Sequence, residues 1–278
     1  MHLHIDPFSG IAGDMFLGAA IDLGAPLEGV LKALKPLSVS KPYRVTTDRV
    51  QRHGISAVDL KVHTDRDKHA GAPTDHHHHD HPHHTHYRDL LAMIDQLDTS
   101  DRARDRARRV ATELAEAEAK VHGMPIQKVH FHEVGAVDSI VDMLGSAVAL
   151  ELLGVDTLSC GALPISRGFV KCDHGVMPVP APATAYLMRG LPTVGVDRTG
   201  ELVTPTGAAI VAALCDSSGP PPAMTLQGVG YGSGDREDPK VPNLLRLMLG
   251  EVTPPGKQTP GTQPPDPALP QTPVAQDV

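Results

Sequence analysis

Hydrophobic residues recur along this chain at two spacings, and the switches between them predict the order of its elements. Alternating residues at 1–6, a glycine-rich turn at 7–14 and an apolar run at 15–25 predict a strand, a turn and a helix. Alternation within 43–64, broken at His53-Gly54, predicts two strands joined by a turn. Further strand-like units lie within 129–134, 155–165, 168–179, 191–196, 201–204, 223–232 and 243–252, and helices are predicted at 26–37, 87–97, 100–123, 136–154, 180–190 and 205–215.

This alternation of strands and helices predicts the α/β class, with one large domain over residues 1–251. Two segments depart from the pattern. Residues 64–86 are polar and rich in His and Asp, which predicts a disordered loop, and residues 252–278 are rich in proline, which predicts a disordered tail. No internal repeat is detected.

Composition excludes several classes of protein. The formal net charge of −8 makes a general nucleic-acid-binding surface improbable, and no apolar run approaches the length of a membrane span. The cysteines Cys160, Cys172 and Cys215 form no CxxC pair, which favours a reducing compartment over a disulfide framework. The N-terminus has no basic region followed by an apolar run, so no signal peptide is expected. We therefore expect a soluble cytoplasmic protein.

Histidines crowd the segment "DHHHHDHPHHTH" at positions 75–86, far from either end of the chain. Imidazole binds first-row divalent ions, and several together raise the local ligand concentration. An unpatterned polar loop, however, lacks the single fixed geometry that a catalytic metal needs. The run predicts metal acquisition or storage through His76, His77, His78, His79, His81, His83, His84 and His86.

A turn between a strand and a helix, "DPFSGIAGDMF", is the first candidate for chemistry. Its glycines would let backbone N–H groups approach an anion, and Asp6 and Asp14 would suit a phosphate that carries a divalent metal. The alternative interpretation is a tight turn in which Asp14 is an N-cap.

The segment "HFHEVGAVDSIVDMLGSAVAL" is the strongest candidate on physical grounds. His130 and His132 would share a strand face, and Asp138 and Asp142 would share a narrow helix face among small residues. Carboxylates on such an apolar helix are costly unless they bind a cation or another partner. The alternative is that Asp138 caps the helix while Asp142 pairs with an arginine.

Two weaker patterns follow. Cys172 and His174 would share a strand face as a thiol and imidazole pair for nickel, zinc or copper, although a half-buried cysteine beside a surface histidine is more common. Thr204, Thr206 and Gly207 lie where a strand turns into a helix, which suits a phosphate or carboxylate and equally suits ordinary capping by threonine.

Taken in order, "DPFSGIAGDMFLGA", "VHFHEVGAVDSIVD", "CDHGVMPVPAPAT" and "GELVTPTGAAI" resemble the LarC family, the nickel insertion proteins that mature the nickel-pincer cofactor of lactate racemase. The resemblance covers roughly Met1 to Glu251. It implies a CTP-dependent cyclometallase, a nickel-inserting lyase. Such an enzyme inserts Ni(II) into pyridinium-3,5-bisthiocarboxylic acid mononucleotide, and CTP, carried with Mg or Mn, becomes CMP and diphosphate.

The resemblance places candidate site residues at the positions that match these motifs. Those expected in catalysis are Asp6, Asp14, His130, His132, Glu133, Asp138 and Asp142. Those expected to bind the nucleotide substrates are Ser9, Gly10, Gly13, Glu201, Thr204, Thr206 and Gly207. Cys172 and His174 join the histidines of the run as expected metal ligands.

Members of that family commonly continue into a smaller second domain implicated in CTP binding and oligomer formation. The resemblance therefore implies either a separate polypeptide that supplies this domain or a partial or divergent member. The expected recipient is apo lactate racemase or a related nickel-pincer enzyme. Two other functions stay open: a nickel store or metallochaperone without catalysis, and a metal-dependent phosphohydrolase that uses Asp6, Asp14, Asp138 and Asp142.

Overall fold

The computed structural model describes residues 1–37, 39, 42–64, 85–131, 135–172 and 174–253. Most of the predicted His-rich loop and nearly all of the predicted tail lie outside these residues. At their predicted boundaries Thr64 ends a strand, His86 lies in a strand and Val252 ends a strand, so the regular structure extends slightly further than the sequence pattern indicates.

A seven-stranded mixed sheet forms one side of the molecule, in the order β11-β6-β1-β13-β12-β3-β2. Parallel pairs join β1 to β6, β6 to β11 and β12 to β3, whereas β1–β13, β12–β13 and β2–β3 are antiparallel. Its strands are β1 His2–Asp6, β2 Tyr43–Arg52, β3 Ile55–Thr64, β6 Thr157–Cys160, β11 Ser217–Ser218, β12 Met224–Ser233 and β13 Leu244–Val252. The predicted α/β class is confirmed, with a mixed sheet.

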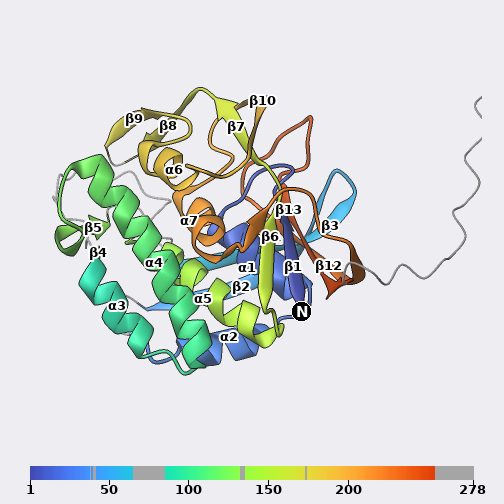
Figure 1. The fold of residues 1–278 in the computed structure, drawn as a ribbon, viewed down its shortest axis with the longest axis horizontal. Helices are drawn as coiled ribbons and strands as arrows, with labels where there is room; N and C mark the ends of the chain where they lie inside the picture. Colours follow the sequence, from blue (N-terminus) through green and yellow to red (C-terminus); the bar gives the residue numbers. More distant parts are fainter. Residues whose placement is uncertain (38, 40–41, 65–84, 132–134, 173, 254–278) are drawn as a thin grey trace, which may run out of the picture.

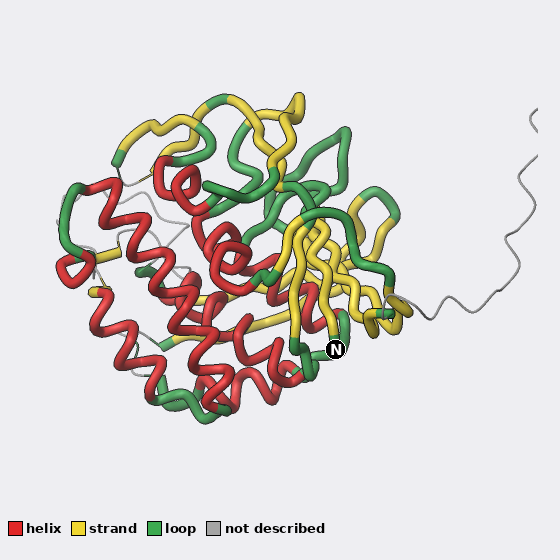
Figure 2. The backbone as a smooth tube through the Cα atoms, viewed as in Figure 1, coloured by secondary structure: helices red, strands yellow, loops and turns green. Residues whose placement is uncertain are grey.

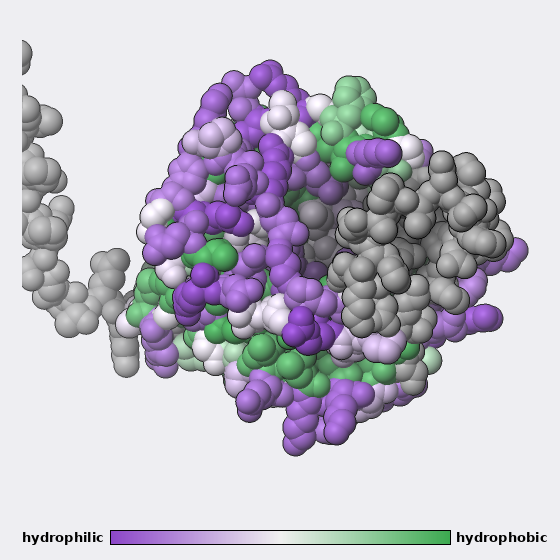
Figure 3. Space-filling model, turned by 180° about the vertical axis from the view of Figure 1, so that it is seen from behind, coloured by the Kyte–Doolittle hydropathy of each residue, from purple (hydrophilic) through white to green (hydrophobic). Residues whose placement is uncertain are grey.

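Three two-stranded sheets lie outside this sheet: β4 Thr85–His86 with β5 His130–Phe131, β7 Leu163–Arg167 with β10 Thr193–Thr199, and β8 Phe169–Cys172 with β9 Gly175–Pro178. The β8–β9 hairpin exposes 71% of Phe169 and 68% of Val176, and an apolar patch is visible over it in Figure 3.

The helices gather on one side of the sheet, as Figures 1 and 2 show. They are α1 Gly13–Asp22, α2 Leu27–Leu34, α3 Tyr87–Asp95, α4 Asp101–His122, α5 Val137–Leu152, α6 Pro182–Leu187 and α7 Pro205–Leu214. Helix α1 packs directly on β3, β12 and β13, while α5 packs against α1, α2, α4 and α7. Helix α5 is therefore the central helix of the core.

Close approach of α1 to the sheet depends on glycine in β12. A Cβ atom on Gly232 would lie 1.8 Å from the carbonyl oxygen of Met15 and 2.7 Å from the nitrogen of Ala19. Only a residue without a side chain allows this spacing. The sequence "GVGYG" thus determines how near α1, and the loop before it, lie to the strands.

Local signals in the sequence account for the ends of several elements. The Ser100 hydroxyl accepts a hydrogen bond from the Ala103 N–H and caps α4, and Gly123 ends α4 in the left-handed conformation. His53 and Gly54, both with positive φ, form the predicted turn between β2 and β3. The expected strand at 201–204 is wrong, because Val203 makes only an isolated bridge to Ile11.

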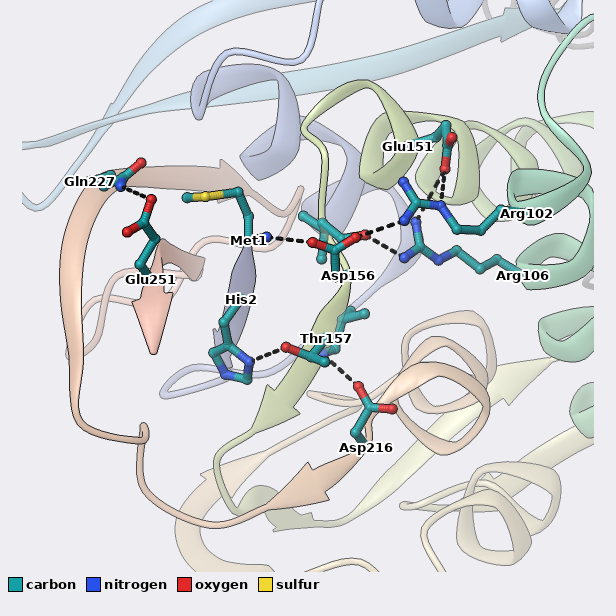
Figure 4. A network of polar contacts seen from close by, with 12 residues as sticks. Met1, His2, Arg102, Arg106, Glu151, Asp156, Thr157, Asp216, Gln227 and Glu251 are labelled. Carbon is teal, nitrogen blue, oxygen red and sulfur yellow. Dashed lines mark hydrogen bonds and ion pairs between the residues drawn. The ribbon is translucent and has the colours of Figure 1, made fainter. Parts of the chain in front are cut away.

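A polar network ties α4 and α5 to the start of β6 (Figure 4). Arg102 of α4 donates hydrogen bonds to Glu151 at 2.6 Å and to Asp156 at 2.8 Å, and Asp156 also accepts from the Met1 ammonium at 2.6 Å. His2 on β1 bonds Thr157 beside it. These contacts join the start of β1 and the start of β6 to α4 and α5, and they stabilise the scaffold. No helix among the described residues has the length and apolar character needed to cross a membrane.

Candidate functional site

A cavity of about 330 Å³ opens where α1, α5, β3 and the start of α7 meet. The predicted residues Gly13, Asp14, Asp138, Asp142, Thr204 and Thr206 line it, together with Lys61 and Asp235. The structure thus brings residues from three of the four sequence motifs to one cavity. We call it the carboxylate cavity.

Asp142 lies at the inner wall of this cavity, on a helix that is otherwise apolar. Only 9% of the residue is exposed, and Ser146, one turn later, bonds the Asp142 backbone carbonyl. The buried Oδ1 of Asp142 has no hydrogen-bond partner among the described residues. The alternative pairing of Asp142 with an arginine is wrong within those residues. Buried carboxylate oxygens without a hydrogen-bond partner are rare in folded proteins, which makes Asp142 a candidate functional group.

The neighbouring carboxylates of the cavity repel one another, which disfavours the ionised form of Asp142. Burial raises the pKa of Asp142 well above its ordinary value, and the neighbouring carboxylates of Asp14 and Asp138 raise it further. Burial also raises the pKa of Asp14, although the Met15 N–H bond and Lys61 oppose the shift. A divalent cation or a cationic ring would relieve this repulsion.

Lys61 is the cation that faces the carboxylates. Its ammonium lies 3.1 Å from Asp59 and contacts Asp235, and its side chain is 33% exposed. Lys61 and Asp59 lie two residues apart on β3 and share a strand face, whereas Leu60 between them is buried. The cavity therefore presents both signs of charge, with carboxylates in excess.

The threonines at the start of α7 confirm the capping interpretation. The Thr204 hydroxyl accepts from the Gly207 N–H at 3.2 Å, and Thr206 accepts from the Gly13 N–H at 3.3 Å. A Cβ on Gly13 would lie 2.8 Å from the Asp142 Cβ. Gly13 and Gly207 allow α1, α5 and α7 to pack closely. Their N–H groups already donate to threonine hydroxyls, and binding of an anion by these N–H groups stays a prediction.

Helix α1 begins at Gly13 with Ala12 as its N-cap, and α5 begins at Val137 with Ala136 as its N-cap. Asp14 and Asp138 are therefore each the second helical residue, and both capping alternatives are wrong. Each carboxylate accepts the next backbone N–H, from Met15 and Ser139 respectively, at 2.8 Å.

The first part of the glycine turn faces elsewhere. Arg246 donates to the Asp6 carboxylate at 2.9 Å and lies over the Phe8 ring at 5.9 Å. Ser9 is fully buried and accepts a hydrogen bond from Arg198 at 2.8 Å. Neither Asp6 nor Ser9 lines the carboxylate cavity, so the four aspartates of the phosphohydrolase hypothesis do not assemble.

Gly10 has a φ of 122°, and its N–H donates to the Pro7 carbonyl, so it serves the turn itself. Glu201 is half-buried and does not line the carboxylate cavity.

Of the predicted histidines in the segments 75–86 and 130–132, the structure describes His86 and His130, and neither lines the carboxylate cavity. His130 on β5 faces His86 on β4 across the two-stranded sheet, with ring centres 6.0 Å apart. His132 and Glu133 lie outside the described residues, as do the other histidines of the run, so their expected roles stay predictions.

Cys172 and His174 line a second cavity, of about 280 Å³, which we call the thiol cavity. Their expected sharing of a strand face is wrong, because Cys172 ends β8 and His174 lies in the turn before β9. Glu118 and His122, on the last turns of α4, line the same cavity. Within the described residues, no three His, Cys, Asp or Glu side chains stand close enough together to form a completed metal centre.

Sequence reasoning missed four of these side chains. Lys61 and Asp235 carry no local signal, because only the packing of β3 and the loop after β12 against the helices brings them to the cavity. Glu118 and His122 did carry one: they lie four residues apart on one helix face.

Comparison with known proteins agrees with the earlier resemblance. The family model described as "Nickel insertion protein" matches residues 3–267. A protein of Citrifermentans bemidjiense named "Putative nickel insertion protein" is 48% identical over 251 residues, 90% of this chain and 61% of its own length. The "Pyridinium-3,5-bisthiocarboxylic acid mononucleotide nickel insertion protein" of Geobacillus kaustophilus is 44% identical over 251 residues, 90% of this chain and 60% of its own.

The chain thus spans about three fifths of the length of these curated relatives. No solved structure matches it. Because the family model covers nearly the whole chain, the protein belongs to the nickel insertion protein family.

Proposed function

We propose that this chain catalyses the insertion of Ni(II) into pyridinium-3,5-bisthiocarboxylic acid mononucleotide, and that the reaction occurs in the carboxylate cavity. The observation that carries this proposal is the buried Asp142 carboxylate, whose Oδ1 has no hydrogen-bond partner among the described residues and which shares its cavity with Asp14 and Asp138, in a chain of the nickel insertion family. The named substrate comes from the relative of Geobacillus kaustophilus.

Insertion of nickel into the pyridinium ring requires a base that accepts the ring proton. Nickel replaces the proton on the ring carbon between the two thiocarboxyl groups, so the C–H electron pair becomes the carbon–nickel bond and the proton must leave. The two thiocarboxylates supply the sulfur–nickel bonds, and nickel stays in the +2 state. Asp142, as a carboxylate whose pKa burial raises, is a stronger base than an exposed aspartate and is suited to accept this proton.

The charges of the cavity match the substrates. Asp14 and Asp138 provide hard oxygen ligands that attract Ni(II) and the cationic pyridinium ring while holding the metal less tightly than sulfur does, which leaves Asp142 as the base. Lys61 and the Thr204 and Thr206 hydroxyls offer contacts for the anionic thiocarboxylates or phosphate. Passage of nickel from carboxylate oxygen to thiocarboxylate sulfur is downhill for this borderline ion.

The reaction uses CTP, with Mg or Mn, converted to CMP and diphosphate, and we expect a separate polypeptide to supply the CTP-binding domain where this chain does not. The recipient of the product is apo lactate racemase or a related nickel-pincer enzyme. The His-rich run serves as the nickel reservoir.

The test is incubation of the chain with Ni(II), CTP and the bisthiocarboxylate nucleotide, with and without a candidate second-domain polypeptide, followed by mass spectrometry. We expect a product in which Ni(II) has replaced protons of the substrate, and Asp142→Asn should lower its rate by about 10²–10⁴-fold. Asp197→Asn, an exposed aspartate outside the cavity, is the matched control and should change the rate less than about threefold. An Asp142→Asn chain that turns over at the parental rate would show that Asp142 is not the base.

His130→Ala separates two versions of the site. The sequence alone predicts that this change abolishes insertion, whereas the position of His130 outside the carboxylate cavity favours a smaller effect. The incubation also tests the alternative function of a nickel store. That function would be supported if the parental chain bound Ni(II) through the His-rich run but never formed the nickel product.

A further inference from the structure

We infer that the thiol cavity is a second nickel site, a transit site that hands the ion to the carboxylate cavity. Its donors are the Cys172 thiol and the His122 and His174 imidazoles, oriented by Glu118. The choice of nickel as the ion rests on the proposed function; the site itself rests on its donors and their geometry.

The imidazoles of His122 and His174 are placed for one ion. They come from the end of α4 and the turn of the β8–β9 hairpin, yet their ring centres lie 5.0 Å apart at an interplanar angle of 41°. Two imidazoles bound to one first-row ion through metal–nitrogen bonds of about 2.0–2.1 Å hold their ring centres roughly 5 Å apart. We expect the bound ion to draw one nitrogen of each ring toward it.

Glu118 supports His122 from one helical turn away. Its carboxylate lies 3.4 Å from the His122 Nε2, and the two side chains are 16% and 21% exposed. A carboxylate at one ring nitrogen favours the proton there and leaves the other nitrogen, Nδ1, as an electron-pair donor. This carboxylate–imidazole arrangement orients histidine ligands in many metal sites.

Sulfur completes the donor set. Cys172 lines the cavity at the end of β8, and the Met177 thioether lies across the hairpin. Thiolate with two imidazoles is a borderline-soft set that selects nickel, zinc or copper over magnesium. Binding replaces the Cys172 thiol proton, which passes to the buffer, and the ion stays in the +2 state.

The thiol cavity lies next to the carboxylate cavity, which suits it to pass nickel from one to the other. Pro205, the first residue of α7, lines both cavities, and its neighbours Thr204 and Thr206 line only the carboxylate cavity. Within the described residues these donors do not form a completed metal centre, so we expect them to close around the ion only while it is bound. Nickel would therefore reach the aspartates from a neighbouring site.

The experiment is titration of the full chain with Ni(II) alone, followed by near-ultraviolet absorption. A thiolate-to-nickel charge-transfer band reports sulfur ligation, which the histidines of the run cannot produce. We expect a saturable band, abolished by Cys172→Ser and unchanged by Cys215→Ser, and insensitive to excess Mg(II). His122→Asn and His174→Asn should each raise the Ni(II) midpoint about tenfold or more. His53→Asn, at an exposed turn, is the matched control.

Two results would overturn the inference: no band in the parental chain at saturating Ni(II), or a band that persists in Cys172→Ser. The histidine variants decide the matter independently should the cysteine variant melt at a lower temperature. A chain that shows the band but makes no product refutes the proposed insertion alone. A chain that makes product without the band refutes the transit site alone.

Discussion

Asp14 of α1 and Asp142 of α5 line the same cavity, where burial and the negative charge of Asp14 raise the pKa of Asp142. Two aspartates from distant parts of the chain are held together, against their mutual repulsion, by the packing of α1 on α5. Close packing at Gly13, where no Cβ fits beside Asp142, makes this proximity possible.

The cost of this arrangement predicts how Asp142→Asn changes stability with pH. The folded-state pKa of Asp142 is raised, so its stabilising contribution is complete below the ordinary value of 3.8 and is lost as pH rises through the folded pKa. Asparagine does not titrate. The free energy of unfolding of the Asp142→Asn variant should therefore exceed that of the parental chain at neutral pH, and the difference should shrink toward pH 4.

Urea denaturation at several pH values measures this difference. Asp138→Asn, one turn earlier and exposed, is the matched control and should change the free energy of unfolding by no more than about 0.5 kcal/mol. A destabilised Asp142→Asn chain at neutral pH would show that the carboxylate is satisfied in the folded protein.

Packing between α7 and the glycine turn predicts a strong effect of Gly207→Ala. The added Cβ would lie 2.4 Å from the Ile11 carbonyl oxygen, a backbone atom that cannot rotate away. We expect a loss of about 1–3 kcal/mol in the free energy of unfolding. Gly195→Ala has no atom within 4 Å of its added Cβ and should change stability by no more than about 0.5 kcal/mol. Equal melting temperatures for the two variants would show that the added Cβ at position 207 does not clash with the Ile11 carbonyl oxygen.

Arg198 and Arg167 predict a contrast between a half-buried and an exposed ion pair. It donates to Asp238 at 2.9 Å and to Ser9 at 2.8 Å, and the side chains of Arg198 and Asp238 are 10% and 9% exposed. Arg198→Ala removes the ion pair with Asp238 and the hydrogen bond to Ser9, while the Asp238 carboxylate still accepts from the Lys240 and Val241 N–H groups, so it should lower the free energy of unfolding more than Arg167→Ala does. Arg167→Ala removes a pair with Asp197 that is 72% and 81% exposed and should cost no more than about 1 kcal/mol. Comparable losses in chemical denaturation would refute this reasoning.

His2 and His4 predict sensitivity to acid. The Ser159 hydroxyl lies 2.8 Å from both rings, and burial lowers the pKa of each from its ordinary 6.5. Below 6.5 the unfolded chain binds more protons, so the free energy of unfolding falls as pH drops toward the folded pKa values. The slope contributed is at most about 1.4 kcal/mol per pH unit for each histidine.

The double variant His2→Gln/His4→Gln should flatten this dependence between pH 7 and pH 5. Thermal melts across that range measure it, and a slope identical to the parental one would mean that other groups govern acid sensitivity.

Deletion of residues 75–86 tests the reservoir. We expect the deleted chain to bind fewer Ni(II) ions and to insert nickel at the parental rate when free Ni(II) is ample, because the proposed base and ligands lie elsewhere. At limiting Ni(II) the rate should fall. Mass spectrometry over a Ni(II) series measures both regimes, and loss of turnover at saturating Ni(II) would place part of the reaction on the run itself.

Local information in the sequence sufficed for the elements and for the identity of the central carboxylates. Ser100 and Gly123 bound α4 because a hydroxyl cap and a left-handed glycine act within a few residues. Asp142 was recognisable because a carboxylate on an otherwise apolar helix contradicts its surroundings. The family resemblance followed from motifs that are each contiguous in the chain.

Tertiary structure alone decided which of these residues act together. Lys61 reaches the carboxylates only because β3 packs against α1, whereas Asp6 and Ser9, close to Asp14 in sequence, turn to Arg246 and Arg198. His122 meets His174 because α4 ends beside the β8–β9 hairpin. Spacing along the chain determines which face of an element a residue occupies, but the neighbour across that face depends on long-range packing, which no local pattern contains.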